Sequence, residues 1–539
     1  MKTTKKLLAL LLAVCMVLGM TACAGSGTPA SSTTTDTTSA GETAQKVDTD
    51  GKSKTVSIAI SENITDLDPH NHNNVVNSMM DDMLYSMLVK ADHEGNYNPA
   101  LATEWSVSED GTEWTFKLRE GVLFSNGEPF NADDVVCTFQ RLIDSPELVC
   151  AASNWTALKA VEKIDEYTAK ITLSESIGTM LLALSMTPII PDQAYAEMGK
   201  DLFYGQKMYG TGKWKFIEWV DGQYLKLAKN ENSWEGNDSY FDDVNIRFIL
   251  ESSTAINAQI TGDVDAYIAS GGIAADMLSM YAGSENKIEI VNVPCSTIDY
   301  LQFQCEEGSV FADPDVRRAF SMAIDRQTII DNIFGGGGYP TGVTSVSTMG
   351  YDPDYTCEYY EYNPEKAKAL LETTGYAGEE LVISSNVATT NAEAMLLAIS
   401  ENVNAIGFNT RIEVVEGATL LDMRSSGNYD MFVVAAMMTS GDFFSFANLR
   451  VLNDAHHSNY VNEEMFDQIC EANVNPDNTV RDECYRTMNQ IMCEECAPMI
   501  GLLTLNANEA VTYGITGIGL YSDGFYGFEN ISYDPSLVK

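Results

Sequence analysis

Apolar and polar residues alternate with a period of two in three short segments of the chain. These segments are 55–60 (TVSIAI), 114–118 (WTFKL) and 167–173 (YTAKITL). Successive side chains of a strand point to opposite faces of a sheet, so this alternation is typical of a strand with one buried face. Each segment therefore predicts a half-buried strand.

Apolar residues recur at helical spacing in other segments, and capping residues mark where those helices begin. The segment from Val75 to Leu88 predicts one helix. Asn131 is predicted to cap a second helix, because Asn favours the N-cap position. Asp133 and Asp134 follow in its first turn, where acidic side chains suit the helix dipole.

Two further helices are predicted to begin with a capping residue followed by Pro. Asp313-Pro314 opens a helix whose apolar residues continue to Ile330. Asn363-Pro364 opens another, which Gly375 is predicted to end at its C′ position. Three basic residues lie opposite the apolar face of the first helix: Arg317, Arg318 and Arg326. We interpret them as a solvated or ion-paired helix face.

Mixed strands and helices along the chain predict an α/β or α+β body, and composition then limits its partners. The 539 residues include 77 Asp and Glu against 32 Lys and Arg, a net charge of −45. Binding to phosphate groups needs clustered basic residues, so we expect neither a nucleic-acid partner nor electrostatic adsorption to anionic lipid. A hydrophobic fraction of 45% is normal for a globular protein.

The N-terminal residues predict export. Lys2, Lys5 and Lys6 precede an uncharged run from Leu7 to Met20, which is shorter than the roughly 20 residues of a membrane helix. Residues 1–22 are therefore read as a signal peptide. Cys23 then follows small residues, as in the bacterial lipobox, and is expected to carry a lipid; the alternative is ordinary secretion with Cys23 incidental. Residues 23–53, rich in Ser, Thr and Gly, are predicted to be a flexible tether.

Nine Cys remain after Cys15 in the signal and Cys23, and their scattered positions do not indicate a disulfide scaffold. Because the number is odd, at least one is free or pairs with another chain. Cys493 and Cys496 form a C-x-x-C, but the two Glu between them oppose thiol activation. We interpret this pair as structural, with redox and zinc roles as the alternatives.

Five motifs, in the same order along the chain, carry a resemblance to a known family. They are the stretch from Asn98 to Val136, Gly210 to Phe216, Phe311 to Arg326, Tyr362 to Leu371, and Cys496 to Leu505. Together they resemble the family 5 extracellular solute-binding proteins, which are the peptide, dipeptide and nickel receptors of ABC importers. The resemblance covers about residues 54–539.

The resemblance implies a two-lobed α/β fold, the type II periplasmic-binding-protein-like fold, with an extra subdomain inserted in lobe 1. Lobe 1 would comprise about 54–97, 209–300 and 509–539, the inserted subdomain about 98–208, and lobe 2 about 301–508. It further implies a lipid-anchored monomer without a cofactor. This receptor would capture a peptide or related small solute between its lobes and deliver it to an ABC permease and ATPase.

In peptide-binding members of this family, an Asp of lobe 2 that follows a Trp pairs with the ligand's amino group. The matching stretch here, 435–446, places Thr439 at the Asp position and Asp442 at a later acidic position, and it lacks the Trp. Thr439 and Asp442 are therefore candidate ligand contacts. A non-peptide solute, such as an oligosaccharide or a nickel chelate, stays open as the alternative.

Three short segments supply the other candidate contacts. His70 and His72 lie two residues apart and could meet a metal or a carboxylate, or simply belong to a polar loop. The aromatic candidates and their neighbour are Asn154, Trp155, Phe443 and Phe444. Asn154 and Trp155 could stack on a ligand, or Trp155 could be buried in the subdomain. Phe443 and Phe444 could line an apolar pocket or pack beneath the hinge.

Two other classes of function were weighed. A secreted hydrolase could use paired carboxylates, but no G-x-S-x-G or H-E-x-x-H motif occurs and the chain has only five His. A surface adhesin would show repeats or sandwich-like strand spacing, and neither is present. Neither class explains the five ordered motifs, and the resemblance that they carry implies a binding protein and not an enzyme.

Overall fold

The structure is a computed structural model that describes residues 54–92, 96–285, 287–346, 348–387, 389–437, 443–521 and 525–538. All of these residues belong to one compact unit, 44–539. Within these ranges, no helix combines the length and apolarity needed to cross a membrane. The predicted signal peptide, Cys23 and the tether lie outside the described residues.

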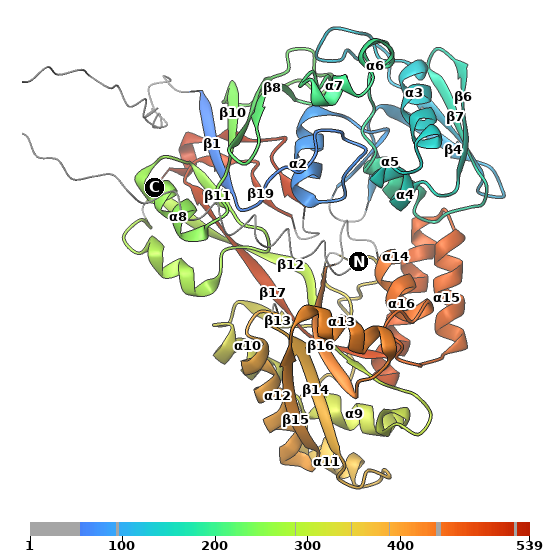
Figure 1. Cartoon of the computed structure of the whole chain (residues 1–539), viewed down its shortest axis with the longest axis vertical. Helices are drawn as coiled ribbons and strands as arrows, with labels where there is room; N and C mark the ends of the chain where they lie inside the picture. Colours follow the sequence, from blue (N-terminus) through green and yellow to red (C-terminus); the bar gives the residue numbers. More distant parts are fainter. Residues whose placement is uncertain are drawn as a thin grey trace, which may run out of the picture. The chain divides into compact units, whose positions relative to one another are not determined.

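One eleven-stranded mixed sheet runs through the fold (Figure 1). Its order is β15-β14-β16-β12-β17-β11-β1-β10-β9-β8, and β13 pairs with β17 beside this path. The strands are β1 (Thr55–Ile60), β8 (Trp214–Val220), β9 (Tyr224–Lys229), β10 (Asp243–Phe248), β11 (Ala266–Ile268), β12 (Ile288–Phe303), β13 (Gly338–Pro340), β14 (Glu380–Asn386), β15 (Asn409–Val415), β16 (Met431–Met437) and β17 (Met499–Thr512).

The two longest strands, β12 and β17, join the two halves of this sheet. They run antiparallel to each other over most of their length. The C-terminal part of β12 pairs with β16, whereas the C-terminal part of β17 pairs with β11. The polypeptide therefore crosses between the halves along these two strands.

A separate four-stranded sheet has the order β4-β5-β7-β6. Its strands are β4 (Ala102–Val107), β5 (Glu113–Leu118), β6 (Leu158–Asp165) and β7 (Thr168–Leu173). Helix α3 (Ala132–Asp144) packs on it (Figure 1), and together they bury a core that includes Trp114, Phe116, Phe139 and Trp155. This sheet lies within residues 98–208, the segment predicted to be the inserted subdomain. The predicted lobe boundaries stay a prediction.

The remaining helices surround these sheets (Figure 1). They are α2 (Val75–Leu84), α4 (Val149–Asn154), α5 (Met180–Ser185), α6 (Asp192–Met198), α7 (Asp201–Tyr204), α8 (Ser252–Thr261), α9 (Pro314–Ala323), α10 (Arg326–Ile333), α11 (Pro364–Leu371), α12 (Ala392–Ile406), α13 (Gly417–Ser426), α14 (Phe444–Phe446), α15 (Glu463–Val474) and α16 (Asn478–Glu495). Three two-stranded sheets complete the fold: β2 (Val89–Ala91) with β3 (Tyr97–Pro99), β18 (Ile515–Thr516) with β21 (Ser532–Tyr533), and β19 (Gly519–Leu520) with β20 (Tyr526–Gly527).

The three strands predicted from alternation are confirmed as β1, β5 and β7. The predicted cap of α3 is confirmed too: Asn131 accepts a hydrogen bond from the Asp133 amide, and Asp134 accepts one from the Asn131 amide. The first predicted helix begins at Val75 as expected but ends at Leu84, four residues early. Tyr85 there turns to extended backbone, with φ −114° and ψ 167°.

The helix predicted from Pro314 to Ile330 is in fact two helices, α9 and α10. Ile324 is extended, with φ −85° and ψ 116°, and Asp325 caps α10 by accepting the Thr328 amide at 3.0 Å. The prediction that Gly375 ends α11 is wrong, because the helix ends at Leu371. Thr373 and Thr374 donate their hydroxyls to the last carbonyls instead, at 2.7 and 2.8 Å.

The interpretation of the three Arg as a solvated or ion-paired face holds for Arg318 and, as an ion pair, for Arg317, whose Nη2 lies 3.6 Å from Glu495 Oε2. It is wrong for Arg326, which is buried and donates to backbone carbonyls. Arg317 and Arg326 are buried. Arg317 donates to the carbonyls of Phe311 and Glu495, and Arg326 donates to those of Ser321 and Gly501. Only Arg318 lies nearer the surface, where it pairs with Asp315 at 3.0 Å. A guanidinium has five N–H donors. Through these donors, the side chains of Arg317 and Arg326 connect α9 and α10 to the chain around β17.

Candidate functional site

A cavity that is open at its mouth lies beside α2. Its polar and charged lining residues are His72, Asn73, Ser78, Asp81, Asp82, Ser86, Lys90, Ser153, Asn154, Ser185, Glu235 and Glu529. Its apolar and aromatic lining residues include Pro69, Tyr85, Met87, Ala91, Ala100, Val149, Met186, Trp234 and Phe525. Concave sites with an apolar lining and a few placed polar groups are the usual form of small-ligand sites.

Helix α2 supplies the polar wall of this cavity. Ser78, Asp81, Asp82 and Tyr85 follow one another at intervals of three, one and three residues, which places them on one side of the helix and its C-cap. The opposite side, with Met79, Met80, Met83 and Leu84, is buried in the core under the large sheet. The amphipathic pattern of α2 therefore orients the acidic side chains towards the cavity.

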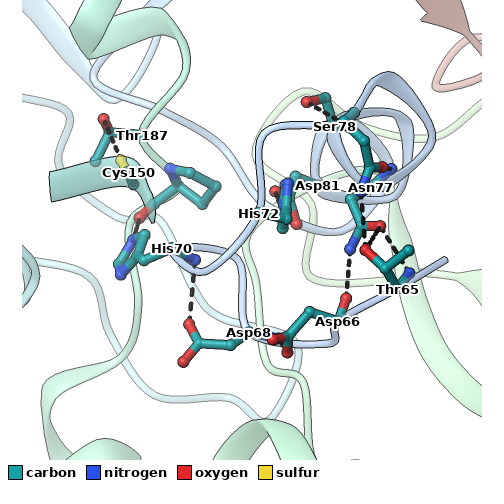
Figure 2. A network of polar contacts seen from close by, with 12 residues as sticks. Thr65, Asp66, Asp68, His70, His72, Asn77, Ser78, Asp81, Cys150 and Thr187 are labelled. Atoms are coloured by element: carbon teal, nitrogen blue, oxygen red, sulfur yellow. Dashed lines mark hydrogen bonds and ion pairs between the residues drawn. The ribbon is translucent and has the colours of Figure 1, made fainter. Parts of the chain in front are cut away.

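His72 and Asp81 form the most buried charged pair of the cavity wall (Figure 2). His72 Nε2 lies 2.8 Å from Asp81 Oδ2, and the two side chains are only 5% and 4% exposed. Burial lowers the pKa of His72, but the Asp81 carboxylate and its hydrogen bond raise that pKa by more. Burial raises the pKa of Asp81, although His72 opposes that shift. The two side chains therefore form a close, poorly hydrated pair in the cavity wall.

Three buried polar atoms of this wall have no hydrogen-bond partner among the described residues. They are His72 Nδ1, Asp81 Oδ1 and Tyr85 Oη. Most buried polar atoms in proteins are hydrogen-bonded, and a buried atom without a partner is costly. All three atoms belong to residues that line the cavity.

Basic charge in the cavity wall comes mainly from Lys90. Its Nζ lies 3.5 Å from Glu529 Oε1. Glu529 and neighbouring acids, Glu235 and Asp82, raise the pKa of Lys90 although its burial opposes this. The ammonium is thus held in its charged form beside acidic neighbours.

The loop that carries His72 is fixed from behind by a buried ion pair. Asp68 and Arg141 pair in a bidentate contact, and their side chains are only 1% and 3% exposed. Arg141 comes from α3, so this pair ties the loop after β1 to the helix on the four-stranded sheet. Asp66 and Asn77 add polar contacts at the other end of the loop (Figure 2).

His70 completes this buried support and does not line the cavity. Its Nδ1 lies 2.6 Å from Arg141 Nη1, and its Nε2 lies 2.8 Å from the Pro188 carbonyl. Since Arg can only donate and a carbonyl can only accept, Nε2 carries the proton and the ring is neutral. Burial and then the Arg141 charge lower the pKa of His70 to about 4.

The structure separates the other candidates predicted from sequence. Asn154 lines the cavity. Trp155 is buried, donates from Nε1 to Thr187 Oγ1 at 2.8 Å and meets Phe139 edge to face. Phe443 is buried in a different core, where it packs on Tyr485, and Phe444 lies half-buried in α14 next to it. Thr439 and Asp442 lie outside the described residues.

Sequence reasoning missed Asp81, Asp82, Tyr85, Lys90 and Glu235, all of which line the cavity. A signal for the first three was present: polar residues at helical spacing interrupt the apolar run of the predicted helix 75–88. Lys90 and Glu235 carried no such signal, because they reach the cavity only through the tertiary fold.

Within the described ranges, no group of three or more His, Cys, Asp or Glu residues is arranged to hold a metal ion. The nine Cys of those ranges are all free, and eight of them are buried or half-buried. Cys493 and Cys496 are both buried at the end of α16, and Cys496 donates its thiol to the Cys493 carbonyl at 3.4 Å.

Comparison with known proteins identifies the family. The sequence profile described as bacterial extracellular solute-binding proteins, family 5 Middle, matches residues 96–455. The chain belongs to this family. The resemblance predicted from the five motifs is thereby confirmed.

The relatives of this family 5 protein include proteins named for what they bind. The oligopeptide-binding protein AppA of Bacillus subtilis is 27% identical over 371 residues, which are 65% of this chain and 67% of AppA. The glutathione-binding protein GsiB of Escherichia coli is 25% identical over 495 residues, 88% of this chain and 94% of GsiB. These relatives are binding proteins rather than enzymes.

Similarity to solved structures establishes the fold of this family 5 protein. The structure of HbpA2 from Haemophilus parasuis superposes with a TM-score of 0.78 at 22% identity and covers 89% of this chain and 100% of HbpA2. The predicted fold class is confirmed: the protein has the type II periplasmic-binding-protein fold.

Proposed function

We propose that this protein is the substrate-binding component of an ABC importer and that it captures a peptide or a related small solute. The observation that carries the proposal is a cavity with unsatisfied buried polar atoms in a chain that belongs to the solute-binding family 5. The oligopeptide-binding name of AppA supports peptides as the substrate class, and so does the glutathione-binding name of GsiB, since glutathione is a tripeptide. The cavity is concave and lined by both apolar and polar groups, as small-solute sites usually are.

In this proposal the ligand lies against the cavity wall of α2 while the second half of the large sheet closes over it. Strands β12 and β17 are the two connections that would bend, since they join the halves of the sheet. Hinge closure of two lobes around a ligand is a common switching motion in binding proteins. The closed, liganded form is then the form that a permease selects.

The protein is further proposed to be held at the membrane by a lipid on Cys23. The support comes from the sequence, where an uncharged run of 14 residues ends shortly before Cys23. Metabolic labelling with an alkyne fatty acid tests this: wild type should be labelled and Cys23→Ser should not. Label retained by Cys23→Ser would exclude this site of lipidation.

The substrate class is tested by thermal-shift screening of the purified protein against di- to pentapeptides, oligosaccharides and nickel chelates. A ligand at 100 times its Kd should raise the unfolding free energy by about 2.7 kcal/mol. Peptides are expected to give the shift. A shift with sugars or metal chelates alone would overturn the peptide assignment, and turnover of any compound to products would overturn the binding role.

A further inference from the structure

We infer that the cavity beside α2 seats a positively charged organic group of the ligand, an ammonium or guanidinium, against the carboxylate of Asp81. This inference rests on the proposed binding function and names the chemistry of its substrate. It assigns the recognition of the cation to the loop after β1 and to α2.

The first observation is the excess of acid in the cavity wall. Four carboxylates line the cavity: Asp81, Asp82, Glu235 and Glu529. The lining basic residues are Lys90 and His72, so the acids outnumber them. A concave site lined by one sign of charge concentrates ligands of the opposite sign. An anionic solute would meet repulsion here, and a cationic one attraction.

The second observation is that the Asp81 carboxylate is only half satisfied. Its Oδ2 bonds to His72, while its Oδ1 is buried without a partner among the described residues. The side chain is 4% exposed, so bulk water does not solvate it. A charge buried in this way needs a counter-charge or further hydrogen bonds. A donor brought by the ligand supplies both.

The third observation is the kind of atom that surrounds this oxygen. Tyr85 lies one turn after Asp81, and its Oη is buried without a partner; so is Nδ1 of His72. Asp81 Oδ1 and the Tyr85 hydroxyl oxygen can each accept a hydrogen bond, whereas His72 Nδ1 accepts only while the ring is neutral. An ammonium has three donors and no acceptor, so it can donate to either oxygen.

The rest of the lining favours an organic cation. Met87, Val149, Met186 and Trp234 give the cavity an apolar portion. A hydrated inorganic ion gains nothing from such a surface, whereas the carbon chain of an amine buries apolar area on it. The expected occupant is therefore a peptide amino terminus, or a Lys or Arg side chain, with hydrocarbon beside the charge.

The test is calorimetric titration of purified wild type, Asp81→Asn and the control Asp133→Asn. Asp133 is a suitable control because it is 48% exposed and lies outside the cavity lining. The probes are lysyl-dialanine, trialanine, N-acetyl-trialanine and the diamine cadaverine. Asp81→Asn should weaken the cationic probes by about tenfold to 100-fold, the usual effect of losing a hydrogen bond to a charged group. Asp133→Asn should bind as wild type does.

A second variant guards against misfolding of Asp81→Asn. Tyr85→Phe removes only the hydroxyl and should weaken lysyl-dialanine several-fold. In wild type, N-acetylation of trialanine, which removes its only positive charge, should weaken binding by at least tenfold. The inference is overturned if N-acetyl-trialanine binds as tightly as trialanine, or if folded Asp81→Asn binds lysyl-dialanine within twofold of wild type.

The probes also separate this inference from the proposed function. If the peptides bind but neither acetylation nor Asp81→Asn matters, peptide binding survives and the cationic seat is wrong. If cadaverine alone binds and depends on Asp81, the cationic seat survives and the peptide assignment is wrong. If no positively charged probe binds wild type, the inference is overturned.

Discussion

Breaking the buried pair of Asp68 and Arg141 should destabilise the fold far more than breaking an exposed ion pair of the described residues. Replacing Asp68 with Asn keeps the shape of the side chain but leaves the Arg141 charge without a counter-ion, with both side chains at most 3% exposed. Breaking a buried pair by removing one partner costs about 3–5 kcal/mol. Asp68→Asn should therefore be strongly destabilised.

The expected loss of unfolding free energy can be measured as a fall in the melting temperature, Tm. Unfolding entropy is about 2.1 cal/mol/K per residue, or roughly 1 kcal/mol/K for the roughly 480 residues of the folded body. A loss of about 3–5 kcal/mol then lowers Tm by about 3–5 °C. Differential scanning calorimetry without ligand measures this directly.

The matched control is the same substitution in an exposed pair. Asp133 pairs with Lys163 at 2.7 Å, but the side chains are 48% and 37% exposed. Exposed pairs contribute about 0–1 kcal/mol, so Asp133→Asn should lower Tm by about 1 °C or less. Equal shifts for Asp68→Asn and Asp133→Asn would refute the reasoning. The double variant Asp68→Asn with Arg141→Met should recover part of the loss, because no buried charge is then left unpaired.

Three further predictions concern single side chains. Burial lowers the pKa of His70 from 6.5 to about 4 in the folded chain, so the unfolded chain takes up a proton first as the pH falls. The free energy of unfolding should therefore fall by up to about 3 kcal/mol between pH 6.5 and pH 4. His70→Gln should reduce this pH dependence, as measured by denaturation curves at each pH. Burial raises the pKa of Asp299 from 3.8 to about 7, so stability is lost as the pH rises through that window, and Asp299→Asn should raise Tm at pH 8 but not at pH 4. A Cβ on Gly178 would lie 2.2 Å from the Ala472 carbonyl oxygen. Gly178→Ala should therefore disturb the hydrogen bond from the Gly178 amide to the Asn473 carbonyl, which is 2.7 Å long, and speed hydrogen exchange of that amide. The control Gly375→Ala has open space around its Cβ and should leave this exchange rate unchanged.

Elements governed by local chemistry could be predicted from the sequence. The cap at Asn131 depends on side chains within three residues, and the strand at 55–60 depends on its own alternation. The helix cap and the strand each depend on interactions within one turn or one strand, so the neighbouring sequence is enough to predict them.

Features governed by distant partners could not be predicted in the same way. Arg326 is buried because the Gly501 carbonyl, 175 positions away, accepts from it. The apolar spacing around Ile324 is continuous, yet the helix breaks there because Asp325 caps a new one. The periodicity of α9 and α10 alone contains neither fact.

The candidate site shows the same division. His72 was found from its place after the first strand, but its partner Asp81 was not, and Trp155 proved to belong to a core. The cavity is assembled from segments as far apart as residues 69 and 529, so its outline depends on the tertiary fold. His72 and Asn154 were the cavity residues predicted from the sequence, whereas the polar residues of α2 were missed although their helical spacing was visible there.

The central claim is that this protein binds a small solute at one site and releases it unchanged. Isothermal titration of the purified protein with the best peptide from the screen, followed by mass spectrometry of the recovered peptide, tests it most directly. The account predicts saturable binding of one peptide per chain and full recovery of intact peptide. Absence of saturable binding by any peptide of the panel, or recovery of cleaved products, would contradict it.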